Sequence, residues 1–201
     1  MKLAFMGAGH PLRLAFALCS AVAPVSALAH SEAAGSGLMS GLLHPVTGMD
    51  HLLAMLSVGI VSVRLGGAHI WRIPAAFVST MALGAWAGFH GWLTPPYEAG
   101  IAWSVLLLGL AIACDGARRA VSMIFVCVAL FGVCHGYAHG AEIPAADSAL
   151  FYVTGFLIST VFIHVVGIFI GELASSSRRH TMALRASGVA MSLAGVWFVA
   201  H

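Results

Sequence analysis

Residues 148–173 read SALFYVTGFLISTVFIHVVGIFIGEL, an apolar run in which Glu172 is the only charged residue. An α-helix needs about 20 apolar residues to cross the hydrocarbon core of a bilayer. Five further stretches of this kind occur, at roughly 37–63, 72–93, 98–117, 120–140 and 182–200. The sequence therefore predicts an all-α protein, a polytopic membrane helical bundle with six transmembrane helices.

The composition supports this class. Of the 201 residues, 60% are hydrophobic and 8% are charged, whereas charged residues make up about a quarter of a soluble domain. The short connections leave no room for a second domain, and the cysteines show no disulfide framework or C-x-x-C spacing. Glycines four residues apart predict close helix seams. They are Gly84 and Gly88, Gly132, Gly136 and Gly140, and Gly167 and Gly171.

The first 29 residues are predicted to be a cleavable signal peptide. Lys2 and Arg13 precede the apolar run 14–22, and the small-residue sequence 27–29 offers a cleavage site. Cleavage would leave residues 30–201 as a single six-helix transporter domain. His30 would then be the amino-terminal residue, with a free amine beside its imidazole for metal chelation.

Charged residues predict the orientation of the bundle. Six spans that start outside place the loops near 64–72, 113–119 and 174–185 in the cytoplasm, and all basic residues beyond the signal lie in them, as the positive-inside rule requires. They are Arg64, Arg72, Arg118, Arg119, Arg178, Arg179 and Arg185. The prediction is a multi-pass protein of the bacterial cytoplasmic (inner) membrane with both mature termini outside. Acidic residues would form an outer rim that concentrates cations. They are Glu32, Glu98, Glu142 and Asp147.

Two histidine motifs lie within the apolar stretches: HPVTGMDH at 44–51 and HGYAHGAE at 135–142. Ionisable groups inside a bilayer usually mark function, and imidazole with carboxylate suits a borderline divalent metal ion. On the predicted topology both motifs fall in the outer leaflet, at one depth with His90 and Glu98. The shared depth predicts metal ligands along one path, namely His44, Asp50, His51, Glu98, His135, His139 and Glu142.

Helix geometry refines this prediction. His135 and His139 share one helix face about 6 Å apart, so both rings can grip one ion, and Glu142 follows on nearly the same face. His44 and His51 would lie about 10 Å apart along a straight helix. Either the helix is interrupted around Pro45 and Gly48, or the two histidines mark successive stations. Pro45 is expected in a first helical turn, which would leave His44 non-helical. Asp50 is expected to face a neighbouring helix or to hold His51 from behind.

Other candidates have two interpretations each. His164, at the middle of its span, is a deeper station or an interhelical hydrogen-bonding residue, and His90 is a ligand or an aromatic-belt residue. The methionines are interpreted as packing rather than as a copper site, because no M-x-x-M ladder links them. They are Met39, Met49, Met55, Met81 and Met123.

The motif forms H-x5-D-H and H-G-x-A-H-G-x-E, with the signal and six spans, resemble the HupE/UreJ family of nickel permeases over essentially the whole mature chain. The resemblance implies a bundle that passes nickel across the cytoplasmic membrane and a link to hydrogenase or urease maturation. It points to both motifs, to Glu98, and more loosely to Phe77. Where the family usually has phenylalanine, this chain has Cys134, which could add a soft ligand.

The predicted function is uptake of Ni²⁺ or Co²⁺ as a transported ion, by a permease that is not an enzyme and has no prosthetic group. Its partners are the metal ion and the lipid bilayer, not nucleic acid. No P-loop is present, so facilitated diffusion and proton coupling both stay open. Uptake should weaken as pH falls through the histidine range near 6.5. The alternatives are an intramembrane zinc-dependent hydrolase using the same histidines, a haem-binding cytochrome subunit, and an anchoring subunit.

Overall fold

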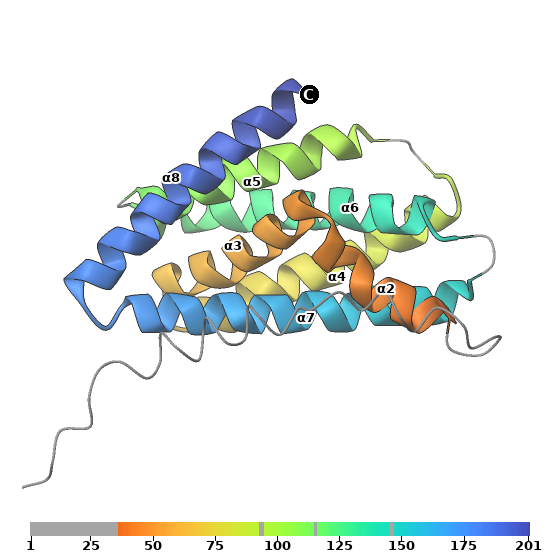
Figure 1. Cartoon of the computed structure of the whole chain (residues 1–201), viewed down its shortest axis with the longest axis horizontal. Helices are drawn as coiled ribbons and strands as arrows, with labels where there is room; N and C mark the ends of the chain where they lie inside the picture. The colour runs from red at the N-terminus through yellow and green to blue at the C-terminus, as the bar shows by residue number, and fades with distance from the viewer. Residues whose placement is uncertain (1–35, 93–94, 115, 145–146) are drawn as a thin grey trace, which may run out of the picture. The chain divides into compact units, whose positions relative to one another are not determined.

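A computed structural model describes residues 36–92, 95–114, 116–144 and 147–201. Within these ranges the chain is entirely helical, with no strand, which confirms the all-α prediction (Figure 1). The predicted signal peptide and His30 lie outside the described residues, so the division at residue 29 stays a prediction. The helices are α2 (Ser36–Thr47), α3 (Met49–Leu65), α4 (His69–Phe89), α5 (Tyr97–Ala113), the short 3₁₀ helix η1 (Ala117–Ala120), α6 (Val121–Ala141), α7 (Ala149–Ala174) and α8 (Arg178–Ala200).

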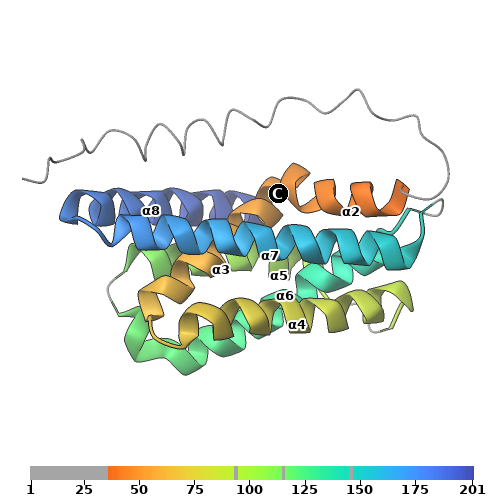
Figure 2. The ribbon, with the colours of Figure 1, turned by 90° about the horizontal axis from the view of Figure 1, so that it is seen from below.

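The helices pack mainly in pairs. α4 runs along α6, α5 runs along α8, and α7 lies against both α2 and α3 (Figures 1 and 2). Among the described residues, three helices, α6, α7 and α8, are long and apolar enough to cross a membrane, and the bent pair α2–α3 makes a fourth if it counts as one span. α5 is apolar but has only 17 residues, and α4 has His69 and Arg72 in its first turn. The described helices follow the six predicted stretches in order, and six membrane crossings stay a prediction.

Glycines form the α4–α6 seam. A Cβ added at Gly136 would lie 1.9 Å from the carbonyl oxygen of Met81, and one added at Gly140 would lie 2.0 Å from that of Ala85. Only glycine allows backbones to approach this closely. The constant offset between the paired residues shows that α4 and α6 run parallel, and the predicted small-residue seam is confirmed here.

The first predicted span is broken rather than straight. The axes of α2 and α3 meet at 80° around Gly48, whose extended backbone (φ −84°, ψ 112°) interrupts the helical turns. Of the two alternatives left open by the sequence, the interrupted helix is confirmed. The expectation that Pro45 begins a helix and leaves His44 non-helical is wrong: both lie in the last turn of α2. The helix begins well before them, and it ends at glycine, which has low helix propensity.

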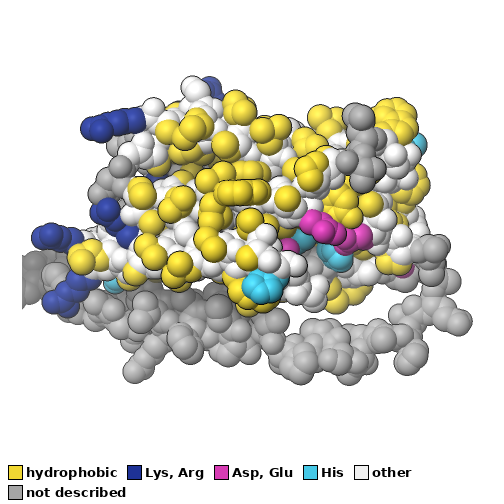
Figure 3. All heavy atoms as spheres, turned by 90° about the horizontal axis from the view of Figure 1, so that it is seen from above, with side chains coloured by type: hydrophobic (Ala, Val, Ile, Leu, Met, Phe, Trp, Pro, Cys, Tyr) yellow, Lys and Arg dark blue, Asp and Glu magenta, His cyan; other side chains and the backbone are white. Residues whose placement is uncertain are grey.

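Arginines gather where several helices end. The guanidinium of Arg64, at the end of α3, donates to the carbonyl oxygen of Cys114 at 2.9 Å, and Nε of Arg185, on α8, donates to that of Ala113 at 2.9 Å. These carbonyls lie at the C-terminal end of α5, where a helix leaves acceptors without intrahelical donors. Figure 3 shows arginines at one end of the visible face and acidic side chains away from it.

The outer surface of the bundle is apolar. Large hydrophobic side chains are exposed on several helices, among them Leu83 (67%), Phe162 (64%) and Leu193 (65%). Hydrophobic side chains also cover much of the face in Figure 3. Soluble proteins rarely expose apolar surface on this scale, and the pattern is typical of helices that face lipid. Some polar side chains are nevertheless buried inside the bundle, among them His135, His139 and His164.

Candidate functional site

Four histidine rings from three helices meet inside the bundle, and we call them the histidine cluster: His44 on α2, His51 on α3, and His135 and His139 on α6. The ring centroids of His51 lie 5.0 Å from those of both His135 and His139. His44 lies 4.9 Å from His139 and 6.1 Å from His51. The bend at Gly48 makes this possible, because it carries His44 and His51 toward each other where a straight helix would separate them.

The orientation of His51 is fixed by its neighbour in the sequence. Oδ1 of Asp50 accepts hydrogen bonds from the backbone N–H of His51 and from Nδ1 of its ring, each at 2.8 Å. A carboxylate only accepts, so Nδ1 carries the proton and Nε2 presents a lone pair. Nε2 is buried and has no hydrogen-bond partner within the described part of the chain. This arrangement, with a carboxylate behind an imidazole, is the one that metal-binding histidines generally have.

His135 is arranged in the same way by a different acceptor. Nδ1 of its ring donates to the carbonyl oxygen of Phe131, one turn earlier on α6, at 2.9 Å. The ring is fully buried, and its Nε2 atom has no partner among the described residues. Two adjacent imidazoles thus have the proton on Nδ1 and a bare Nε2 nitrogen.

His139 completes the buried part of the cluster. It is fully buried and stacks on Phe156 of α7, with ring centroids 4.5 Å apart and ring planes at 16°. Neither of its ring nitrogens has a hydrogen-bond partner in the described ranges. Burying a polar nitrogen without a partner is costly, and a bound ligand would satisfy both nitrogens.

His44 lies at the open side of the cluster. Its side chain is 33% exposed, and its Nε2 atom is 3.5 Å from Oε2 of Glu142, which is 49% exposed. The ring of Tyr152, on α7, lies 5.9 Å from that of His44. One turn before His44, the hydroxyl of Ser40 donates to Asp147 at 2.5 Å. The cluster therefore opens toward a side that carries two carboxylates.

The cluster as it stands is not a finished coordination sphere. No group of three or more His, Cys, Asp or Glu side chains in the described ranges is placed to hold one ion. The rings meet edge to face, at interplanar angles of 67° to 87° in the pairs that include His51. Ligation by three groups at once would require the rings to turn.

Two residues of the sequence analysis lie directly beyond the cluster. The ring of Phe77, on α4, is 5.3 Å from the ring of His135 and 5.2 Å from that of His164 on α7. His164 is 2% exposed, and Phe77 is fully buried. Phe77 thus lies between the cluster and the deeper histidine.

Other predicted residues are not brought to the cluster. Glu98, in the first turn of α5, is exposed and makes no ion pair with the cluster in the described part of the chain. Nδ1 of His90 is 2.9 Å from the carbonyl oxygen of Trp86. Its exposed ring lies among three aromatic rings, those of Trp86, Phe89 and Trp92. Cys134 packs against α5, since a Cβ at Gly100 would lie 2.4 Å from its Sγ.

Sequence reasoning missed two residues of α7 that lie next to the cluster. Tyr152 and Phe156 border the cluster, and they are spaced four residues apart on the helix face that continues to His164. That spacing was visible in the sequence. Aromatic pairs of this kind are common on apolar helices, however, so the spacing alone gives no signal for a site.

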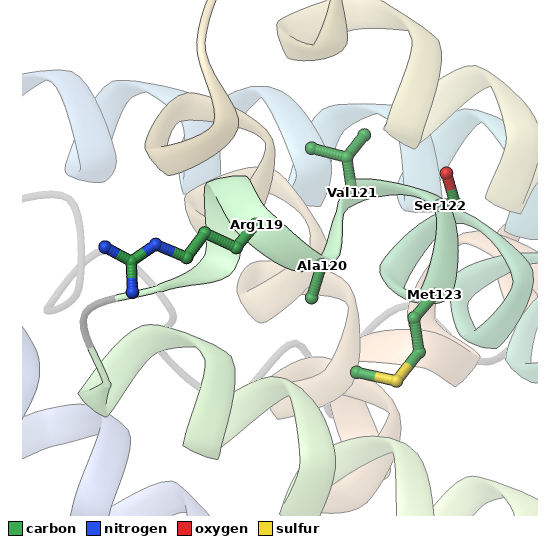
Figure 4. Close-up of a pocket in the computed structure, with 5 residues that line it drawn as sticks. All are labelled: Arg119, Ala120, Val121, Ser122 and Met123. Atoms are coloured by element: carbon green, nitrogen blue, oxygen red, sulfur yellow. The ribbon is translucent and has the colours of Figure 1, made fainter.

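The hollow of Figure 4 lies elsewhere. It is lined by Arg119, Ala120, Val121, Ser122 and Met123, where η1 joins α6. His135 is on the same helix but farther along, by about 20 Å at 1.5 Å per residue. This open hollow is therefore separate from the histidine cluster.

Apolar helices that expose their hydrophobic side chains and enclose histidines define a helical membrane protein with a polar interior site. Comparison with known proteins identifies the group: the HupE / UreJ protein family model matches residues 17–198, and the chain belongs to this family. It is 38% identical to Protein HupE of Rhizobium leguminosarum bv. viciae over 178 residues. This alignment covers 89% of this chain and 92% of that protein. No solved structure matches the chain. The family is one of membrane-associated transport and accessory proteins connected with nickel for hydrogenase and urease, and it is not a family of enzymes.

Proposed function

We propose that this protein takes up nickel ions across the bacterial cytoplasmic membrane through the histidine cluster, and so supplies a nickel enzyme such as hydrogenase or urease. Cobalt is the alternative cargo, because Co²⁺ and Ni²⁺ accept the same ligands and are adjacent in affinity order. The observation that carries the proposal is the pair of buried, unpartnered Nε2 atoms on His51 and His135, each with its Nδ1 atom held from behind. Family membership supports the choice of nickel.

The cluster supports a stepwise passage. Glu142 and His44 lie at the exposed side and attract the hydrated cation. His51, His135 and His139, in the buried part, replace water molecules with imidazole nitrogens. Binding has to stay weak enough for the ion to leave, and a cluster that does not hold three ligands on one point meets that need.

The zinc hydrolase is the principal rival, because the same histidines could hold a catalytic Zn²⁺ with an open coordination position. It predicts one zinc ion per chain that survives purification. A haem-binding subunit predicts a coloured preparation with a Soret absorption band. An anchoring subunit predicts that substitutions in the cluster leave metal uptake unchanged.

Accumulation of radioactive nickel in cells that express the protein tests the proposal. We compare the wild type with a His135→Ala/His139→Ala variant at trace nickel, with and without excess cobalt or zinc. We expect the variant to lose uptake and the stronger competitor to identify the preferred ion.

A His180→Ala variant is the matched control, since this exposed histidine lies on α8 and bonds Ser176 rather than the cluster. Membrane abundance is measured for each protein by immunoblot. Uptake that is absent from the wild type, together with stoichiometric zinc in the purified protein, would replace the permease with the hydrolase.

A further inference from the structure

One face of α7 continues from the histidine cluster into the bundle. Tyr152, Phe156, Thr160 and His164 follow one another at intervals of four residues, which places them in a line along the helix. The first two border the cluster, and Phe156 stacks on His139 at 4.5 Å. Thr160 and His164 therefore extend the polar interior beyond the cluster.

Thr160 has unusual partners for a threonine in an apolar helix. Such hydroxyls usually donate to a carbonyl of their own helix one turn back, as Thr80 and Thr154 do at 2.9 and 2.7 Å. The hydroxyl of Thr160 instead lies 3.4 Å from Sδ of Met55 on α3 and 3.9 Å from Sδ of Met81 on α4. All three side chains are fully buried. Three helices thus bring two thioether sulfurs and a hydroxyl to one point.

His164 lies one turn further along α7. It is 2% exposed, and neither ring nitrogen has a hydrogen-bond partner within the described residues. The backbone there is tightly held: a Cβ added at Gly59 of α3 would lie 2.3 Å from the carbonyl oxygen of His164. The interhelical hydrogen bond that would explain this histidine structurally is not made within the described part of the chain. A ligand explains its unpaired nitrogens.

We propose that Met55, Met81, Thr160 and His164 form a second binding site for a transition-metal ion, which we call the inner site. The inference rests on the proposed function, because the inner site would receive its ion from the histidine cluster. Met55 follows His51 by one turn on α3, and the ring of Phe77 contacts both His135 and His164. The two sites are therefore adjacent, with Phe77 between them.

The donors of the inner site define its ion. Thioether sulfur and imidazole prefer soft ions such as Cu⁺ and borderline ions such as Ni²⁺ and Co²⁺, whereas Mg²⁺ and Ca²⁺ require oxygen ligands. No carboxylate contributes to the inner site. The inner site would therefore admit borderline ions and exclude the abundant hard ions. In this proposal the histidine cluster captures the ion and the inner site selects it.

X-ray absorption at the nickel edge, on purified full-length protein loaded with Ni²⁺, tests the inner site directly. We expect sulfur among the nickel ligands of the wild type and its loss in a Met55→Leu/Met81→Leu variant. Leucine conserves volume and removes only the sulfur. Met191→Leu is the control, since that sulfur also lies 3.4 Å from a hydroxyl, that of Ser57, but outside the inner site.

Uptake of radioactive nickel gives the second readout. We expect the Met55→Leu/Met81→Leu variant, and separately Thr160→Val with His164→Leu, to lower uptake at trace nickel about tenfold, which corresponds to about 1.4 kcal/mol. Met191→Leu and Thr154→Val should leave it unchanged at equal membrane abundance.

The outcomes separate the two proposals. The inner site is supported if the purified wild type shows sulfur ligation to nickel and the double variant does not. This holds even if cells take up no nickel, because absent uptake contradicts only the proposed permease function. Nickel bound through nitrogen and oxygen alone, a sulfur signal that survives in the double variant, or no bound nickel at all overturns the inner site.

Discussion

Asp50 acts through His51, because its carboxylate accepts the hydrogen bonds of that residue's backbone N–H and Nδ1 at 2.8 Å. Asp50→Asn puts a neutral amide in this place, which weakens the bond and no longer fixes the proton on Nδ1. We predict nickel uptake about 10- to 100-fold lower, the usual cost of removing such a partner, at unchanged membrane abundance. Asp147→Asn, where the carboxylate accepts from Ser40, should have a smaller effect. Equal uptake by Asp50→Asn and wild type would remove Asp50 from the site.

Glu142 acts differently, since its carboxylate is half exposed and lies 3.5 Å from His44. In the proposed path it attracts the cation at the exposed side and does not ligate it in the buried part. Glu142→Gln should lower the initial uptake rate roughly threefold to tenfold at low ionic strength. Salt screens exposed charges, so the difference from wild type should shrink as salt is raised. A difference that persists at high salt would make Glu142 a ligand.

Sequence spacing predicted which residues can share one helix face, and this was sufficient for His135 and His139. The partner of each imidazole was not predictable in full. For His51, the sequence left open whether Asp50 holds its ring or faces a neighbouring helix. The hydrogen bond from His135 to the carbonyl oxygen of Phe131 depends on the side-chain rotamer of His135. The exposure of Glu98 depends on packing between α5 and its neighbours, which a one-dimensional pattern does not contain.

The break between α2 and α3 is the element on which the cluster depends. Gly48 has ordinary backbone angles, so alanine there strains nothing in the main chain. Its Cβ would, however, lie 3.2 Å from both Oδ1 of Asp50 and Nδ1 of His51, which would have to move by a few tenths of an ångström. We therefore predict that Gly48→Ala reduces nickel uptake without reducing protein abundance or thermal stability. A loss of folded protein in step with uptake would show that the bend serves folding instead.

At the α4–α6 seam, in contrast to Gly48, we expect a substitution of glycine to reduce stability. Gly136→Ala would place a Cβ 1.9 Å from the carbonyl oxygen of Met81, and only separation of the two helices relieves this contact. We expect destabilisation of about 1–3 kcal/mol or more, measured as a lower unfolding temperature of the detergent-purified protein. Gly171→Ala is the control, because the nearest atoms, at 3.0 Å, belong to the side chain of Val63. Equal unfolding temperatures for the two variants would contradict the seam.

Helix existence followed from the length of each apolar stretch, because a buried or lipid-facing backbone must satisfy its hydrogen bonds internally. The sequence predicted the interruption near Gly48 as one of two alternatives. It did not predict the 80° angle between α2 and α3, because that angle depends on how each helix packs against α7. The prediction for Pro45 was wrong for a related reason. Proline is found near helix starts and near helix ends, and the local sequence does not distinguish the two.

At the scale of the whole molecule, one end of the described bundle carries arginines bonded to the end of α5. The histidine cluster lies toward carboxylates on another side. Such asymmetry matters for a path that captures a cation on one side and releases it on the other. The positive-inside rule predicts that the arginine end faces the cytoplasm, and the histidine cluster would then open outward.

Cys114 allows this orientation to be measured, because it is an exposed free cysteine at the arginine end. We predict that a membrane-impermeant maleimide labels it only after the cells are permeabilised, and that Cys114→Ser removes that label. His201→Cys, at the exposed C-terminal residue that is predicted to lie outside, should be labelled in intact cells. If Cys114 is labelled in intact cells and His201→Cys is not, the protein has the reverse orientation. The histidine cluster would then open toward the cytoplasm, and its capture of ions would serve export rather than uptake.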